Sequence, residues 1–190
     1  MSKKDLYEKI FDQKEQLTDL LTEYWQHYAH MGTWYFWSNL AILLIPLVVL
    51  YFAVDKKRLF EILFYGYSIH VLWSYTDIIL SMNNYLVHPH TLFVVLPIGF
   101  TVSVSLIPVV QMLIYQYCTN NKKNFYLYAA ISALFLSAFG LISESVGLFK
   151  LHKGMNHIYL YFLGLVLAYV AYWATKLFIK FKNTKTKQVI

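Results

Sequence analysis

Three ionisable side chains inside otherwise apolar stretches carry the strongest chemical signal in the chain: His70, Asp77 and Glu144. His70 and Asp77 are seven residues apart, so on an α-helix they share a face about 10 Å apart, and Ser74 falls on that face too. An ionisable group is costly in a bilayer and usually faces the interior of a helix bundle. We therefore expect His70, Ser74, Asp77 and Glu144 to line a polar pocket for a ligand or an ion.

A structural role is the alternative for the same residues. A buried histidine that is hydrogen-bonded to a serine or a carboxylate also holds helices together, and Glu144 could simply meet a lysine of the following loop. Glu61 lies within one helical turn of Arg58, where an exposed ion pair accounts for it. We therefore leave Glu61 outside the predicted pocket.

The histidines are unevenly placed, because six of the seven lie just before the first, third and fifth apolar stretches. Imidazole binds Zn²⁺ and Cu²⁺ and titrates near neutral pH, so this group could form a metal site, a proton antenna or a pH sensor. Their spacing matches no recognised metalloenzyme motif, and we expect no cofactor. The alternative is a metal-dependent membrane enzyme that would bind Zn²⁺ or Cu²⁺ through His88, His90, His152 and His157, assisted by Glu144.

The composition excludes a soluble domain. Of the 190 residues, 58% are hydrophobic and only 14% are charged, whereas a water-facing surface needs roughly a quarter of its residues charged. Crossing a bilayer takes about 20 apolar residues in a helix, and five stretches meet this length. We predict an all-α, polytopic membrane helix bundle with five transmembrane helices over residues 31–54, 59–80, 91–118, 125–149 and 158–179.

The segments outside these five stretches have their own patterns. Residues 1–30 place Leu17, Leu20, Leu21 and Tyr24 at helical spacing among charges. We expect an amphipathic helix that lies on the outer membrane surface or folds back over the bundle; the alternative is a solvated tail. Residues 180–190 form a basic cytoplasmic tail, and Pro97 in the third stretch predicts a kinked or tilted helix.

The lysines and arginines indicate the threading. Ten of the sixteen follow the first and third stretches or close the chain, and the other six lie on the opposite side, four of them in the acidic N-terminal segment. Basic residues favour the cytoplasmic side, so we place the N-terminus outside and the C-terminus in the cytoplasm. Because the positive charges sit at the ends of apolar stretches, no nucleic acid is expected as a partner.

Several segments together resemble a family of small multi-pass membrane proteins from Bacillus-like and Clostridium-like spore formers. The similarity covers residues from about Asn39 to Lys176 and is carried by residues 55–63 (DKKRLFEIL), 68–73 (SIHVLW), 83–90 (NNYLVHPH), 114–118 (IYQYC), 153–157 (KGMNH) and 171–176 (AYWATK). This resemblance implies a bacterial cytoplasmic membrane and no catalytic residue. In size, five spans and aromatic content alone, the chain is also similar to the tryptophan-rich sensory proteins, whose motifs it lacks.

These patterns favour a non-enzymatic, multi-pass protein of the bacterial cell membrane. Its outward-facing polar pocket would sense or pass a proton, a cation or a small ligand. The alternatives are the metal-dependent enzyme and a structural or interaction subunit. The expected partners are the lipid bilayer and either a second copy of the chain or a larger membrane complex.

Overall fold

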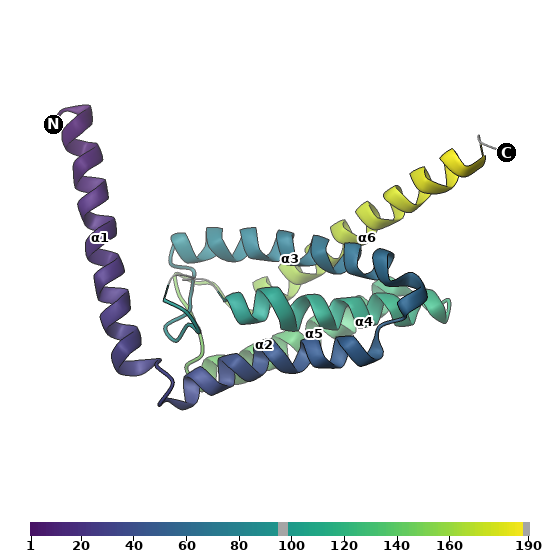
Figure 1. The fold of residues 1–190 in the computed structure, drawn as a ribbon, viewed down its shortest axis with the longest axis horizontal. Helices are drawn as coiled ribbons and strands as arrows, with labels where there is room; N and C mark the ends of the chain where they lie inside the picture. Colours follow the sequence, from purple (N-terminus) through teal and green to yellow (C-terminus); the bar gives the residue numbers. More distant parts are fainter. Residues whose placement is uncertain (95–98, 188–190) are drawn as a thin grey trace.

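Most of the helices pack into one bundle; the first helix projects from one end of it, and the later part of the last helix projects beyond the other end (Figure 1). The computed structural model describes residues 1–94 and 99–187 and is all-α. The helices are α1 Lys3–Tyr28, α2 Trp34–Ala53, α3 Leu59–Met82, α4 Ile107–Asn120, α5 Phe125–Ser145 and α6 His157–Lys187. The shorter elements are the 3₁₀ turn η1 Lys56–Arg58, the π-helical turn η2 Val102–Leu106 and the two-residue strands β1 Leu86–Val87 and β2 Lys150–Leu151.

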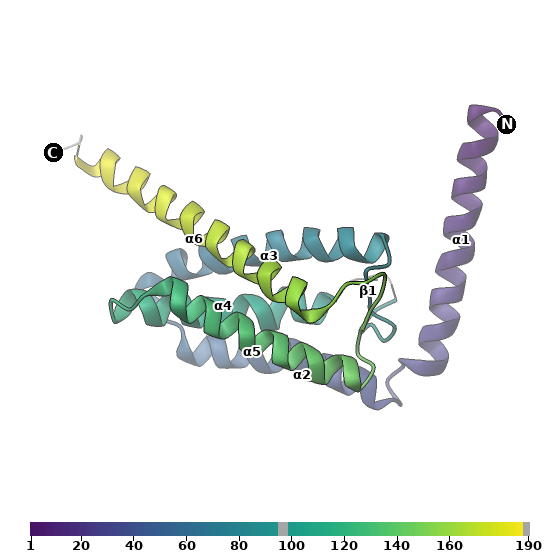
Figure 2. The same cartoon turned by 180° about the vertical axis from the view of Figure 1, so that it is seen from behind.

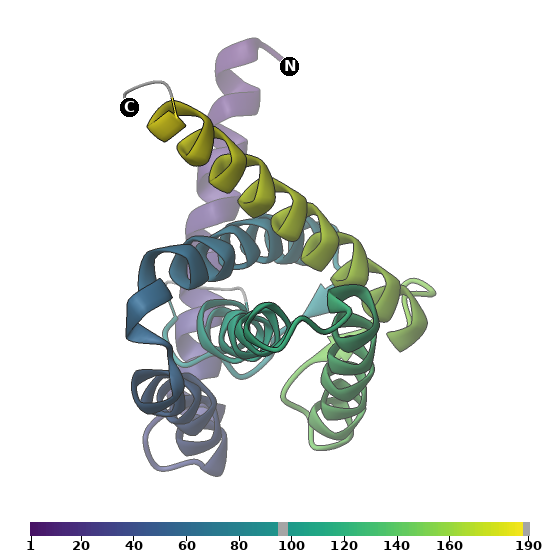
Figure 3. The same ribbon diagram turned by 90° about the vertical axis from the view of Figure 1, so that its right-hand side faces the viewer.

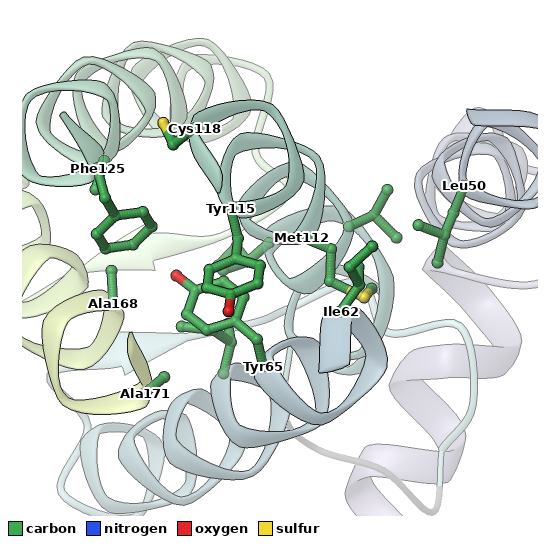
Figure 4. Close-up of a cluster of buried hydrophobic side chains, with 13 residues drawn as sticks. Leu50, Ile62, Tyr65, Met112, Tyr115, Cys118, Phe125, Ala168 and Ala171 are labelled. Atoms are coloured by element: carbon green, nitrogen blue, oxygen red, sulfur yellow. The ribbon is translucent and has the colours of Figure 1, made fainter. Parts of the chain in front are cut away.

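Helix α4 forms the centre of the bundle. It packs against α2, α3 and α5, and α6 closes the ring by packing on α3 and α5 (Figure 3). The core between these helices is aromatic. The buried rings of Tyr65 and Tyr115 stack with their centroids 4.6 Å apart (Figure 4), and Phe125 stacks on Tyr172 at 4.2 Å. Stacked rings bury a large apolar area at defined geometry, so they fix how α3, α4, α5 and α6 pack.

Polar side chains mark the points where the helices begin. The Thr33 hydroxyl accepts from the Phe36 amide before α2, and the Asn124 side chain accepts from the first amides of α5. The side-chain Oδ1 of Asn156 does the same for α6, accepting from the Ile158 and Tyr159 amides at 3.0 Å and 3.2 Å. The first amides of a helix have no partner within it, so these caps satisfy donors that apolar surroundings would leave unpaired.

The two ends of the bundle differ in character. At one end β1 pairs antiparallel with β2, joining the α3–η2 loop to the α5–α6 loop (Figure 2). We call this the clip end. At the other end Arg58 donates to Thr119 and Asn120, which joins the α2–α3 turn to the end of α4. We call this the basic end. Helices α2 and α4 both run from the clip end to the basic end, and α3 runs back between them (Figure 1).

Among the residues that the structure describes, four helices are long and apolar enough to cross a membrane. They are the segments Trp34–Ala53, Val102–Asn120, Phe125–Ser145 and His157–Phe181. Helix α3 also forms, with 24 residues, but falls outside this group. Its charged and polar side chains, Glu61, His70 and Asp77 among them, reduce its mean hydropathy.

The helix boundaries correct the expected stretches in three places. Residues 91–94 are not helical and residues 95–98, including Pro97, lie outside the described part, so the third helix is described from Phe100 onward. Helix α5 ends at Ser145 instead of residue 149, because Gly147 turns the chain at a φ of +80°. Helix α6 continues through Lys187, so residues 180–187 of the expected tail extend the last helix instead, and residues 188–190 lie outside the described part.

The N-terminal segment is helical but does not fold back over the bundle. Its start is fixed by a capping box, in which Ser2 and Asp5 exchange side chain to backbone hydrogen bonds. None of the residues in α1 is buried, and the helix runs across the direction of the bundle helices at the clip end (Figure 1). Its last turn is attached there by the Trp25 indole, which donates to the Thr91 carbonyl oxygen at 3.1 Å.

Candidate functional site

A buried carboxylate anchors the clip end. Asp77, near the end of α3, is only 2% exposed. Its Oδ2 accepts a hydrogen bond from the Gly99 amide at 2.7 Å, and its Oδ1 lies 3.0 Å from Nε2 of His88. A Cβ atom at residue 99 would lie 2.6 Å from the His88 ring, so glycine is required for the histidine to reach the carboxylate. Asp77, His88 and Gly99 therefore form one unit.

A second histidine and carboxylate pair stands on the neighbouring helices. Oε2 of Glu144, on α5, lies 2.6 Å from Nε2 of His157 at the start of α6, and its Oε1 accepts from the Leu151 amide at 3.1 Å. The other ring nitrogen of His157, Nδ1, is buried and has no hydrogen-bond partner among the described residues. This pair therefore holds the α5–α6 loop closed and leaves one nitrogen unsatisfied.

Both histidines line one cavity of about 130 Å³ inside the clip end. The Phe149 ring stands between them, with its centroid 6.2 Å from the His88 ring and 6.1 Å from the His157 ring. The walls are mostly apolar and come from all five bundle helices and the two loops; they include Ile69, Trp73, Phe100, Leu136, Phe139, Leu160 and Leu167. An apolar cavity with a few convergent polar groups is the usual form of a small-molecule site.

The polar side chain at the far end of the cavity is Gln111 of α4. It is buried, its Nε2 donates to Ser132 at 3.1 Å, and its Oε1 accepts from the Tyr65 hydroxyl at 3.3 Å. Tyr65 stacks on Tyr115, whose hydroxyl donates to Glu61 at the basic end. Glu61 forms the expected ion pair with Arg58. The cavity and the ion pair thus border the same aromatic core.

His90 closes the cavity toward α1 and α2. Its ring stacks on Tyr35 with centroids 3.5 Å apart, and its Nδ1 donates to the Gly147 carbonyl oxygen at 2.9 Å. Burial lowers the pKa of His90, and the positive charge of Lys150 acts in the same direction, while the bond to Gly147 opposes them. His90 is therefore held as a neutral ring that joins three segments.

His70 and Ser74 lie outside this cavity. Nδ1 of His70 donates to the Ser103 carbonyl oxygen at 3.1 Å, and Ser74 lies 3.3 Å from the same nitrogen. The backbone explains the contact. Helix η2 has π-type bonds, such as Ile107 N to Val102 O, and the next bond would join residue 108 to Ser103, but Pro108 has no amide hydrogen. His70 supplies the missing donor.

The structure separates the four residues predicted to line a polar pocket. Asp77 lines the cavity, and Glu144 borders it through His157, whereas His70 and Ser74 bind the π-helical turn instead. The expected convergence of His70 with the two carboxylates is wrong, because Pro108 leaves a carbonyl group that the histidine satisfies.

The four histidines considered as metal ligands do not converge either. His88 and His157 each bind a different carboxylate, His90 binds a carbonyl group, and His152 is exposed in the turn after β2. No group of three or more His, Cys, Asp or Glu side chains is arranged to hold a metal ion in the part of the chain that the structure describes.

Several cavity residues carried no recognisable signal in the sequence. Gly99 and Gln111 are single polar or small residues in apolar stretches, and Trp73 and Phe149 resemble the many other aromatic residues of the chain. Only the packing of α3, η2, α4 and α6 brings them together. The sequence singled out His88 and His157 only as possible metal ligands. The structure instead pairs each of them with a carboxylate.

Comparison with known proteins adds no relative. No protein-family model matches the chain, and no curated protein or solved structure is detectably similar to it. The resemblance to small multi-pass proteins of spore formers stays a prediction.

His70 donates to the carbonyl group that Pro108 leaves unpaired, and this relation yields a double-mutant prediction. His70→Leu leaves the Ser103 carbonyl group unpaired and should lower the free energy of unfolding by about 1–3 kcal/mol. Pro108→Ala restores an amide donor to this turn, so the double variant should recover much of the loss in denaturant titrations of the purified protein. Equal losses for His70→Leu with and without Pro108→Ala would contradict the assignment.

His90 predicts a pH dependence of stability. Because its pKa is lowered on folding, the unfolded chain binds the proton more readily, and stability is lost as the pH falls below the unfolded value of about 6.5. His90→Phe keeps a ring against Tyr35 but cannot titrate. Its melting temperature should therefore fall less than that of the parent protein between about pH 7.5 and pH 5.5. Identical falls would show that His90 does not titrate in this way.

Proposed function

We propose that the chain is an integral membrane protein of five spans that senses or passes a small ligand through the clip-end cavity. The observation that carries the proposal is the cavity of about 130 Å³, in which apolar walls meet two histidine and carboxylate pairs.

The direction of the helices supports the fifth span. If α2 and α4 both cross the membrane, they cross it in the same direction, since both run from the clip end to the basic end. The chain must then return across the membrane between them, and α3 is the segment that does so. Its 24 residues extend about 36 Å, which exceeds the hydrocarbon thickness. Its polar side chains Asp77 and His70 are bonded inside the bundle, as a spanning helix requires.

The charge distribution supports the orientation. The basic end carries Lys56, Lys57, Arg58, Lys122 and Lys123, and the positive-inside rule places such an end in the cytoplasm of a bacterial cell. The clip end, its cavity and α1 would then face outward. Helix α1 would lie along the outer membrane surface, because it runs across the bundle and exposes Leu6, Ile10, Leu17 and Leu21.

The cavity supports ligand binding more than the two alternatives. A metal-dependent enzyme would need converging ligands, and the described histidines bind separate partners. An interaction subunit that used the polar stripe of α3 would need that stripe unpaired, yet His70 and Asp77 are bonded to their own chain. A volume of about 130 Å³ is close to that of a cavity of about 150 Å³ that binds benzene, so it suits a ligand whose apolar body is about one ring in size and whose polar group reaches the lining side chains.

The five-span threading predicts a pattern of cysteine accessibility. Because Cys118 is buried, single cysteines can be introduced at Lys57, Asn84, Lys122 and Gly154. A membrane-impermeant thiol reagent added to intact cells should label positions 84 and 154, and positions 57 and 122 only after the membrane is opened. Labelling of positions 57 and 84 from the same side would mean that α3 does not cross the membrane. Labelling of positions 57 and 122 alone in intact cells would mean that the protein has the opposite orientation.

The cavity predicts a selective effect of filling it. Gly164 lines the cavity, and the nearest side chain, Trp73, lies 3.9 Å from where its Cβ would be. Gly164→Leu should therefore occupy the space with little strain. Calorimetric titration with benzyl alcohol should give saturable binding to the parent protein and at least tenfold weaker binding to the variant. Lys9→Leu, on α1 away from the cavity, controls for partition into the micelle. Equal binding by all three proteins would refute the cavity as the site.

A further inference from the structure

We infer that the clip-end cavity selects a small organic cation, an ammonium ion that carries one ring or a branched alkyl group. This inference rests on the proposed function of the cavity and names the class of its ligand. It follows from the charges, the hydrogen-bonding atoms and the walls of the cavity, and from its size.

The charges that border the cavity are negative. Asp77 is the one lining residue with a formal charge, histidines aside, among those the structure describes, and no described lining residue is a lysine or an arginine. Glu144 adds a second carboxylate behind His157. A buried carboxylate is costly unless a positive charge or several donors compensate it. Asp77 has one backbone amide and one imidazole, so a cation is the ligand that gains most from entering.

Two of the groups that border the cavity, His157 and Asp77, have atoms free to accept hydrogen bonds. When His157 donates its Nε2 hydrogen to Glu144, the neutral ring presents a lone pair at Nδ1, and this nitrogen is buried without a partner among the described residues. Asp77 uses each oxygen once, and a carboxylate oxygen can accept more than one bond. A ligand that supplies several N–H donors complements these atoms, and an ammonium group has three.

The walls suit the rest of such a ligand. Trp73, Phe100, Phe139 and Phe149 present aromatic rings, which attract cations through their negative faces. The volume of about 130 Å³ admits a body close to a benzene ring in size. Apolar walls also argue against a bare metal ion, which would need oxygen and nitrogen ligands on several sides. An anion would face Asp77 without a positive partner.

Three probes of nearly equal shape test the charge: benzylammonium, benzyl alcohol and benzoate. Their affinities for the purified protein in detergent at about pH 7.5 are measured by calorimetric titration. Benzylammonium should bind at least tenfold more tightly than benzyl alcohol, and benzoate should not bind measurably. Asp77→Asn should remove the advantage of the cation while leaving benzyl alcohol within about threefold. Glu61→Gln, which alters a carboxylate at the basic end, should leave all three affinities unchanged.

Each outcome separates the inference from the proposed function. If benzyl alcohol binds as tightly as benzylammonium, and Gly164→Leu abolishes both, the cavity is a ligand site but the cation inference is wrong. If none of the three probes binds, the proposed function fails together with the inference. If Asp77→Asn unfolds the protein, Glu144→Gln is used in its place. This variant should reduce the preference for benzylammonium over benzyl alcohol at least threefold. An unchanged preference overturns the inference.

Discussion

The clip end depends on the compensation of one buried charge. Asp77 sits at 2% exposure among apolar side chains, where an unpaired carboxylate would cost several kcal/mol. Both partners belong to the loop that follows α3: His88 comes just after β1, and Gly99 just before η2. They reach Asp77 only if this loop folds back onto α3. Satisfying Asp77 therefore requires the loop to close over the bundle, and the pairing of β1 with β2 extends this closure to Glu144 and His157.

The same requirement accounts for most other polar groups inside the helices. Pro108 leaves the Ser103 carbonyl group without an amide donor, and His70 provides one. Asn39 joins the His90 loop to Thr101, and Glu61 is paired with Arg58. Against this background two buried side-chain atoms of the described residues have no partner, Oγ of Ser81 and Nδ1 of His157. Of these two residues His157 lines the cavity, which is why the cavity, and not the rest of the polar network, is assigned to a ligand.

The sequence predicted the helical class and four of the membrane-length helices, because long apolar runs and the need to satisfy the backbone in lipid leave few alternatives. It also placed Asp77 and Glu144 among the residues of interest, because ionisable groups are costly inside apolar stretches. It misassigned His70, whose partner is set by a π-helical turn that has no simple sequence signature. It also missed Gly99 and Gln111, whose importance arises only from the neighbours that packing gives them.

The hydrogen bond from the Gly99 amide to Asp77 is the most direct test of this account. The chain has seven glycines, so selective ¹⁵N-glycine labelling in lipid nanodiscs gives few signals to assign. The Gly99 amide should exchange with solvent far more slowly than that of Gly154, which stands in an open turn with no atom near its Cβ position. Asp77→Ala should remove this protection. Fast exchange at Gly99 in the parent protein would mean that the carboxylate is not held in this way and that the cavity is not closed as described.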